Sequence, residues 1–88
     1  MSAASSAEPR IEPAALRRPQ AARFVGMGTS TWDRHDAAGL IPEALRIGGV
    51  KVWSVAELKA WLAAGCPDRA AWRDLWVELQ RRQHVAKK

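Results

Sequence analysis

The sequence of 88 residues has few of the features that small proteins use to reinforce a limited core. Cys66 is the single cysteine, so neither an internal disulfide nor a cysteine-based zinc site is available. Tyrosine is absent, and Phe24 is the single phenylalanine. No apolar run approaches the roughly 18 to 20 residues that span a bilayer, and the N-terminus has no signal-peptide pattern. We therefore expect a cytoplasmic protein with no metal or other cofactor, no membrane contact and stability from apolar burial.

Tryptophan and positive charge are what the sequence does contain. Five tryptophans occur in the chain, and each buries about 150 to 250 Å² when it enters a core. Core positions are expected for four aromatic residues that belong to apolar faces: Phe24, Trp32, Trp53 and Trp61. The formal charge is +5. Because the basic residues are spread along the chain, this charge is compatible with a polyanionic partner but does not identify one.

Composition divides the chain into three parts. Residues 1–15 consist largely of Ala, Ser and Pro and are predicted to be a disordered leader. Residues 16–65 contain helical apolar spacing, glycine turns and a short β pattern, and we expect one folded domain. Residues 66–88 predict a C-terminal amphipathic helix followed by a basic tail. The expected fold is mostly α with a small β-hairpin.

Local signals place the elements of the central domain. A short helix is expected to begin near Pro19, and the Gly26–Gly28 segment predicts a tight turn with Met27 filling the corner. A second helix should then run from about Thr29 to Gly39. The Gly48–Gly49 pair between apolar alternating residues predicts a β-hairpin. Ser54 to Glu57 has the pattern of a capping box that begins a third helix. The order is that of a helix-turn-helix followed by a wing.

The residues that carry these signals also resemble a family. Positions 21–32 read AARFVGMGTSTW, positions 38–42 AGLIP, positions 46–49 RIGG, positions 52–53 VW and positions 57–62 ELKAWL. Together they look like the AlpA-type phage regulators and related excisionases, which are MerR-like winged helix-turn-helix DNA-binding proteins. The resemblance covers about residues 16 to 65. It implies that the chain is no enzyme and that its partner is double-stranded DNA.

The resemblance also implies which residues face DNA. Thr29, Ser30, Thr31 and Arg34 fall on the recognition helix, and Lys51 falls in the wing. Asp33 stands where relatives commonly have an aromatic residue. Its carboxylate repels phosphate but accepts a hydrogen bond from cytosine N4, so it either tunes specificity or faces away from DNA. Three arginines flank the first helix and are expected to contact phosphates: Arg17, Arg18 and Arg23.

Three functions remain open at this point. The first is a small transcriptional regulator that binds a specific duplex sequence. The second is an excisionase, a recombination directionality factor of a mobile genetic element, which binds and bends DNA beside an integrase, alone or in a cooperative array. The third is a protein-interaction adaptor that uses an apolar stripe as an oligomer or partner interface: Trp72, Leu75, Trp76 and Leu79. If the stripe is free, replacing Trp72 and Trp76 by Ala should change the mass in solution with little unfolding.

Overall fold

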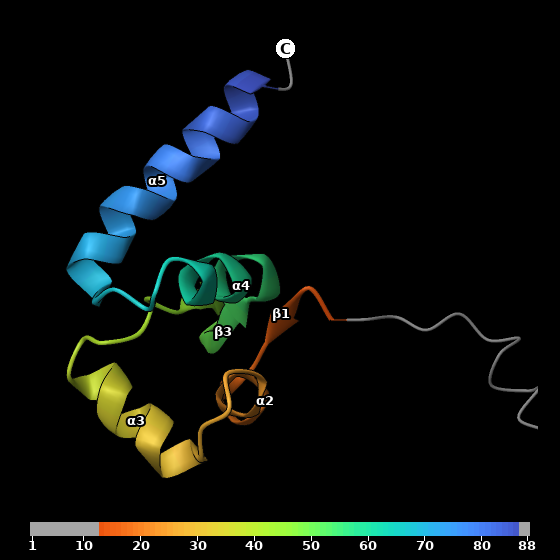
Figure 1. The fold of residues 1–88 in the computed structure, drawn as a ribbon. Helices are drawn as coiled ribbons and strands as arrows, with labels where there is room; N and C mark the ends of the chain where they lie inside the picture. The colour runs from red at the N-terminus through yellow and green to blue at the C-terminus, as the bar shows by residue number, and fades with distance from the viewer. Residues whose placement is uncertain (1–12, 87–88) are drawn as a thin grey trace, which may run out of the picture.

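The structure is a computed structural model that describes residues 13–86, with side chains described as far as Gln83. The described part is a small domain of four helices and a three-stranded antiparallel sheet (Figure 1). Positions 1–12 of the predicted leader lie outside the described residues. The elements in chain order are β1 (Ala15–Leu16), α2 (Arg18–Phe24), α3 (Thr29–Ala37), β2 (Leu45–Ile47), β3 (Val50–Ser54), α4 (Val55–Ala63) and α5 (Arg69–Ala86).

A four-residue turn joins α2 to α3, as the glycines predict. The N–H of Gly26 donates to the carbonyl of Arg23 at 3.0 Å, and the N–H of Met27 donates to the carbonyl of Ala22 at 2.8 Å. This is the Schellman pattern, which needs a left-handed residue after the helix, and Gly26 supplies it with φ of 87°. Met27 packs against the core from the turn. The backbone hydrogen bonds of the turn and the packing of the Met27 side chain therefore both fix the angle between the two helices.

The predicted hairpin forms around Gly48 and Gly49, which have φ of 57° and 87°. Positive φ at both central residues is the requirement of the tight hairpin turn that matches strand twist. Across this turn Arg46 pairs with Lys51, and Leu45 pairs with Val52. The register thus places two cations side by side on one face of the hairpin.

Strand β1 was not expected from the sequence. It pairs antiparallel with β3, so that Ala15 lies opposite Ser54 and Leu16 opposite Trp53, and β3 becomes the central strand. The N–H of Val55 also donates to the carbonyl of Ala14 at 2.9 Å. Ala15, assigned to the leader by composition, is therefore part of the sheet. A two-residue strand has too little alternation to be recognised, and its formation depends on the free edge of β3.

The core is built around tryptophan. Trp32 and Trp53 meet edge to face with ring centroids 5.1 Å apart, and both are buried. Trp61 is buried beside them, as are Ile41 and Leu58 from the flanking segments. Burial of these large indole side chains compensates for the small number of residues available to form a core.

Phe24 is a correction to the expected core, because its side chain is 41% exposed. The buried residues of α2 are Ala21 and Ala22. Their small side chains let the helix approach the rest of the core closely. At 100° per residue, Phe24 falls to one side of the face that they define. The inner face of α2 is therefore marked by its alanines and not by its aromatic residue.

Helix α5 corrects a second expectation. The apolar stripe of α5, expected as an oligomer or partner interface, packs largely against the domain itself. Trp72 is only 1% exposed and belongs to the core, while Trp76 stacks on it at 5.5 Å between ring centroids. Leu79 packs against the same cluster, and Leu75 remains 38% exposed. Replacing Trp72 and Trp76 by Ala should consequently destabilise the fold and not only alter association. The remainder of α5 extends away from the body (Figure 1).

Only one of the two hydrogen bonds of the expected capping box forms. The Ser54 hydroxyl accepts a hydrogen bond from the N–H of Glu57 at 3.1 Å, as predicted. The Glu57 carboxylate, however, accepts from Nε1 of Trp72 at 2.8 Å and so joins α4 to α5. Asp68 caps α5, because its carboxylate accepts from the N–H of Ala71 at 2.9 Å.

Candidate nucleic-acid interface

The outward face of α3 carries Ser30 and Arg34, both exposed. They are four residues apart and so lie on one face of the helix, on the side away from the buried Trp32. Thr29 and Thr31 are half-buried at its first turn. The Thr31 carbonyl lies 2.7 Å from Nδ1 of His35, which donates to it. Ser30 and Arg34, together with Asp33, are therefore the exposed members of the predicted set on α3.

Asp33 lies beside α2 and forms an ion pair with it. Its Oδ1 is 3.2 Å from Nε of Arg18, and both side chains are about half exposed. Two residues predicted to contact DNA thus contact each other. The pairing directs the Asp33 carboxylate toward α2.

An open concavity of about 550 Å³ separates the beginning of α2 from the hairpin. Four cationic side chains line it: Arg17, Arg18, Arg46 and Lys51. Trp53 also borders it but is only 2% exposed, so its ring offers no stacking surface. Residues from two separate parts of the chain therefore converge on one basic surface next to α3, which we call the basic concavity.

Arg46 is a member of this surface that sequence reasoning missed. The signal was present, because a two-residue turn at Gly48–Gly49 places position 46 directly opposite position 51. Arg23, which was predicted, does not line the concavity and lies exposed at the last turn of α2. Among the described side chains of residues 13–83, Arg17, Arg34 and Arg46 take part in no ion pair.

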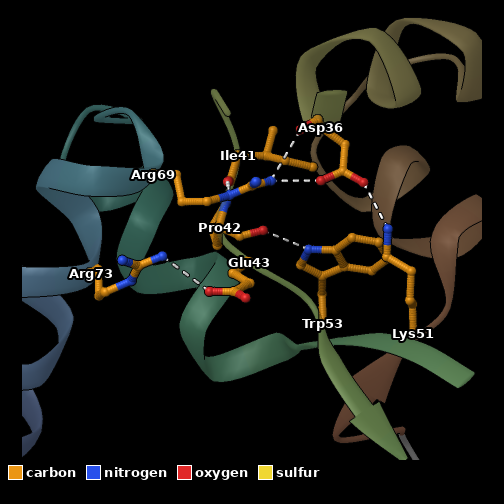
Figure 2. Close-up of polar contacts among 8 residues, drawn as sticks. All are labelled: Asp36, Ile41, Pro42, Glu43, Lys51, Trp53, Arg69 and Arg73. Atoms are coloured by element: carbon orange, nitrogen blue, oxygen red, sulfur yellow. Dashed lines mark hydrogen bonds and ion pairs between the residues drawn. The ribbon is translucent and has the colours of Figure 1, made fainter. Parts of the chain in front are cut away.

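Asp36 joins three elements and contacts Lys51, one of the cations that line the concavity (Figure 2). Its Oδ2 accepts from Nζ of Lys51 at 2.9 Å, and its Oδ1 accepts from Nη2 of Arg69 at 2.6 Å. Arg69 also donates through Nε to the carbonyl of Ile41 at 3.0 Å. The carboxylate thereby connects α3 to the hairpin and to α5. Arg69 was not singled out from sequence, because nothing local marks its partner 33 positions earlier.

The charge state of Asp36 follows from these contacts. Partial burial by itself raises the pKa of a carboxyl group, because the charged form loses hydration. The hydrogen bonds and positive charges of Lys51 and Arg69 outweigh this effect and hold the pKa of Asp36 below its ordinary value. Asp36 is therefore ionised at neutral pH. Lys51 also lies 5.6 Å from the ring centroid of Trp53, which adds a cation–π contact.

The opposite face of the hairpin is apolar. Alternation along the two strands puts Leu45 and Ile47 on the side away from Arg46 and Lys51, next to Val50 at the turn, which also borders the basic concavity. All three are exposed, and Ile47 most of all at 64%. Leu45 also lines a smaller hollow of about 250 Å³ with Trp76 and Val77 of α5. The hairpin thus has one face suited to an anion and one suited to apolar contact.

The described residues contain no cluster of three or more His, Cys, Asp or Glu side chains placed to hold a metal ion. Within the same part of the chain, no helix has the length and apolar character to cross a membrane. No family model matches the chain, and comparison with curated proteins and with solved structures likewise gives no match. The function is therefore inferred from the geometry of the surface itself.

Proposed function

We propose that the chain binds double-stranded DNA with sequence specificity through a winged helix-turn-helix and acts as a small transcriptional regulator. The observation that carries this proposal is the basic concavity, two of whose cations, Arg18 and Lys51, pair with carboxylates of α3. Four cations on α2 and the hairpin suit a phosphate backbone, and a helix with its side chains is about as wide as a major groove. The four-residue turn between α2 and α3 and the following hairpin are the order expected of this motif.

In this arrangement the two parts of the surface have different tasks. Ser30 and Arg34 on α3 would reach base edges, where a guanidinium recognises guanine O6 and N7 in a bidentate manner. The basic concavity would hold the backbone and set the orientation of α3 without reading sequence. Specificity and affinity therefore depend on different side chains, which makes the proposal testable by substitution.

The first test is the salt dependence of duplex binding. Arg17 and Arg46 are the two cations of the basic concavity without an ion-pair partner among the described side chains; if each neutralises one phosphate, log K should fall with log salt with a slope near −1.8, about 0.9 for each contact. Titration of a labelled duplex by fluorescence anisotropy between about 50 and 200 mM salt measures this slope. Absence of duplex binding at the lowest salt contradicts the proposal.

The second test separates base reading from backbone contact. A preferred site is first selected from a random duplex pool. Arg34→Ala should then weaken binding to that site by about 1 to 3 kcal/mol and relax the preference at one base position. Arg17→Ala is the matched control, because it removes the same charge from the basic concavity and should weaken all duplexes alike. Equal losses for Arg34→Ala on selected and random duplexes would assign Arg34 to the backbone.

An excisionase-like role differs from simple regulation in what it requires of the DNA. A directionality factor must bend its site, which costs energy that extra contacts repay. A circular-permutation gel assay on the selected site measures this bend. The regulator that we propose should leave the mobility nearly independent of the position of the site, whereas strong dependence favours the recombination role.

Protein contact is a second candidate function, which the exposed apolar face of the hairpin favours. Ile47, at 64% exposure, is its most accessible member. Self-association through this face would be weakened by Ile47→Ser, and sedimentation equilibrium of both proteins measures the difference. An unchanged monomeric mass in both would leave DNA binding as the function that the surface supports.

A further inference from the structure

Two of the four cations in the basic concavity already hold a carboxylate. Arg18 pairs with Asp33, and Lys51 pairs with Asp36. Both aspartates belong to α3, the helix that we propose to enter the DNA. A phosphate that approaches the concavity therefore meets two cations without a described partner and two that are already engaged.

The two pairs differ in how firmly they are made. Asp36 is half-buried and binds Lys51 and Arg69 at once, while Arg69 bonds further to the backbone of α3. Asp33 has one ionic partner among the described side chains, at 3.2 Å, and both members are about half exposed to water. Exposed pairs of this kind contribute little to stability. Arg18 can therefore leave Asp33 for a phosphate without disturbing the fold, whereas Asp36 supports the fold.

The chemistry of the Arg18 contact makes Asp33 a competitor of phosphate. A carboxylate and a phosphate both bind a guanidinium through anionic oxygens, and the preferred geometry uses two N–H groups at once. Asp33 uses Nε of Arg18. A phosphate must displace this oxygen or accept the remaining N–H groups beside a like charge, and either choice weakens binding.

We propose that Asp33 limits the affinity of this chain for the DNA backbone by occupying Arg18 as an intramolecular substitute for phosphate. The inference rests on the proposed DNA binding and adds a regulation of the same surface. As a consequence, sequence-independent binding is kept weak. The contacts of α3 with base edges then make up a larger share of the total binding free energy. Removal of the carboxylate should strengthen binding to duplexes of any sequence.

The experiment compares Asp33→Asn with the wild-type chain on a short duplex of random sequence. Asp33→Asn should bind about three- to ten-fold more tightly at low salt, chiefly because Arg18 is released to bind a phosphate. The slope of log K against log salt should become steeper by about 0.9, since one more phosphate contact forms. Thermal unfolding followed by circular dichroism should change little, because the pair is exposed.

Two further variants separate this inference from an effect of net charge. Glu78→Gln removes one negative charge from a similarly exposed side chain on α5, where Glu78 pairs with Arg81 and Arg82. It should change duplex affinity by less than about two-fold, since exposed charges beyond a Debye length are screened. In an Arg18→Gln background, Asp33→Asn should lose most of its gain.

The outcomes that overturn the inference are distinct from those that overturn the function. Unchanged or weaker binding by Asp33→Asn, an equal gain from Glu78→Gln, or a full gain in the Arg18→Gln background would each reject the role of Asp33 while leaving DNA binding intact. Absence of binding by the wild-type chain and by every variant at low salt would reject both.

Discussion

At the residue scale, Trp32 and Trp53 are buried in contact with each other but differ in their indole hydrogen bonds. Trp53 donates from Nε1 to the carbonyl of Pro42 at 2.9 Å (Figure 2). Nε1 of Trp32 is buried and has no hydrogen-bond partner among the described residues. A buried donor without a partner reduces stability, whereas a bonded one also satisfies the carbonyl that it contacts.

This difference predicts unequal effects of the same substitution. Trp53→Phe should cost about 1 to 2 kcal/mol more unfolding free energy than Trp32→Phe, because only the former leaves a buried carbonyl without its donor. Each change removes a similar volume, so the two variants are controls for one another. Urea unfolding followed by circular dichroism measures both. Equal losses would show that volume and not hydrogen bonding determines the cost.

Two carboxylates predict opposite effects of pH on stability. The pKa of Asp36 is lowered in the folded chain from 3.8, because Lys51 and Arg69 outweigh the effect of burial. Its ionised form therefore stabilises the fold above that value, and this contribution is lost as the pH falls through the lowered pKa. Burial raises the pKa of Glu57 above 4.5, against the hydrogen bond from Trp72. Its contribution is present below 4.5 and is lost as the pH rises through the raised pKa.

Removing the charge of Asp36 or of Glu57 should reveal these opposite contributions to the pH dependence of stability. Asp36→Asn should lower stability at neutral pH by about 1 to 3 kcal/mol and make the loss on acidification shallower than in the wild-type chain. Glu57→Gln should be at least as stable as the wild type at neutral pH, because the amide oxygen still accepts from Trp72 and no charge is buried. Melting temperatures across acid and neutral pH test both. Parallel pH profiles for the two variants would contradict the opposite assignments.

At the element scale, α5 combines a docked beginning with an extended end. Arg69 and Trp72 attach its first turns to α3 and α4. From Gln80 to Gln83 every side chain is exposed. Most of the stability that α5 provides should therefore come from the turns up to Leu79.

Truncation tests this division of α5. A chain that stops after Gln80 should lose less than about 1 kcal/mol, since it gives up exposed ion pairs of Glu78 and no residue described as buried. A chain that stops after Asp68 should fail to fold, because loss of Trp72 alone is expected to cost about 3 to 5 kcal/mol. Cooperative unfolding of the shorter chain with unchanged stability would show that the core is complete without α5.

Elements with strong local signals were the predictable ones. The left-handed glycines at positions 26, 39 and 65 each follow a helix, and the sequence indicates all three ends. The hairpin around Gly48–Gly49 is likewise confirmed. Strand β1 was missed because its two residues are held by an edge and not by their own pattern. Helix α5 was expected, but its docking was not, since the partner of Trp72 is a carboxylate on α4.

At the scale of the whole molecule, the placement of charge matters more than its total. The chain carries a formal charge of +5, and part of its positive charge lies on α5, away from α2 and α3 (Figure 1). Arg81 is paired with Glu78 there, whereas Arg46 lines the basic concavity. Two arginines of equal formal charge should therefore contribute differently to binding of a polyanion.

A pair of substitutions with the same change in net charge measures this difference. Arg46→Gln should weaken duplex binding and reduce the magnitude of the salt slope by about 0.9, because one phosphate contact is lost. Arg81→Gln should leave the slope nearly unchanged. Anisotropy titrations at several salt concentrations compare them. Equal changes would mean that the chain binds DNA through its net charge and not through the concavity.

The sequence by itself determined the order of the elements from α2 to α5, the turns between them and the burial of most tryptophans. These depend on local backbone preferences and on apolar periodicity, which act within a few residues. Only the tertiary structure decided that Phe24 is exposed and Trp72 buried, that β1 joins the sheet, and that Arg46 meets Arg17 across a concavity. It also decided which cations are engaged, because Asp33 and Asp36 find their partners at positions distant in sequence. Such pairings depend on the angles at which elements pack, and no local pattern encodes those angles.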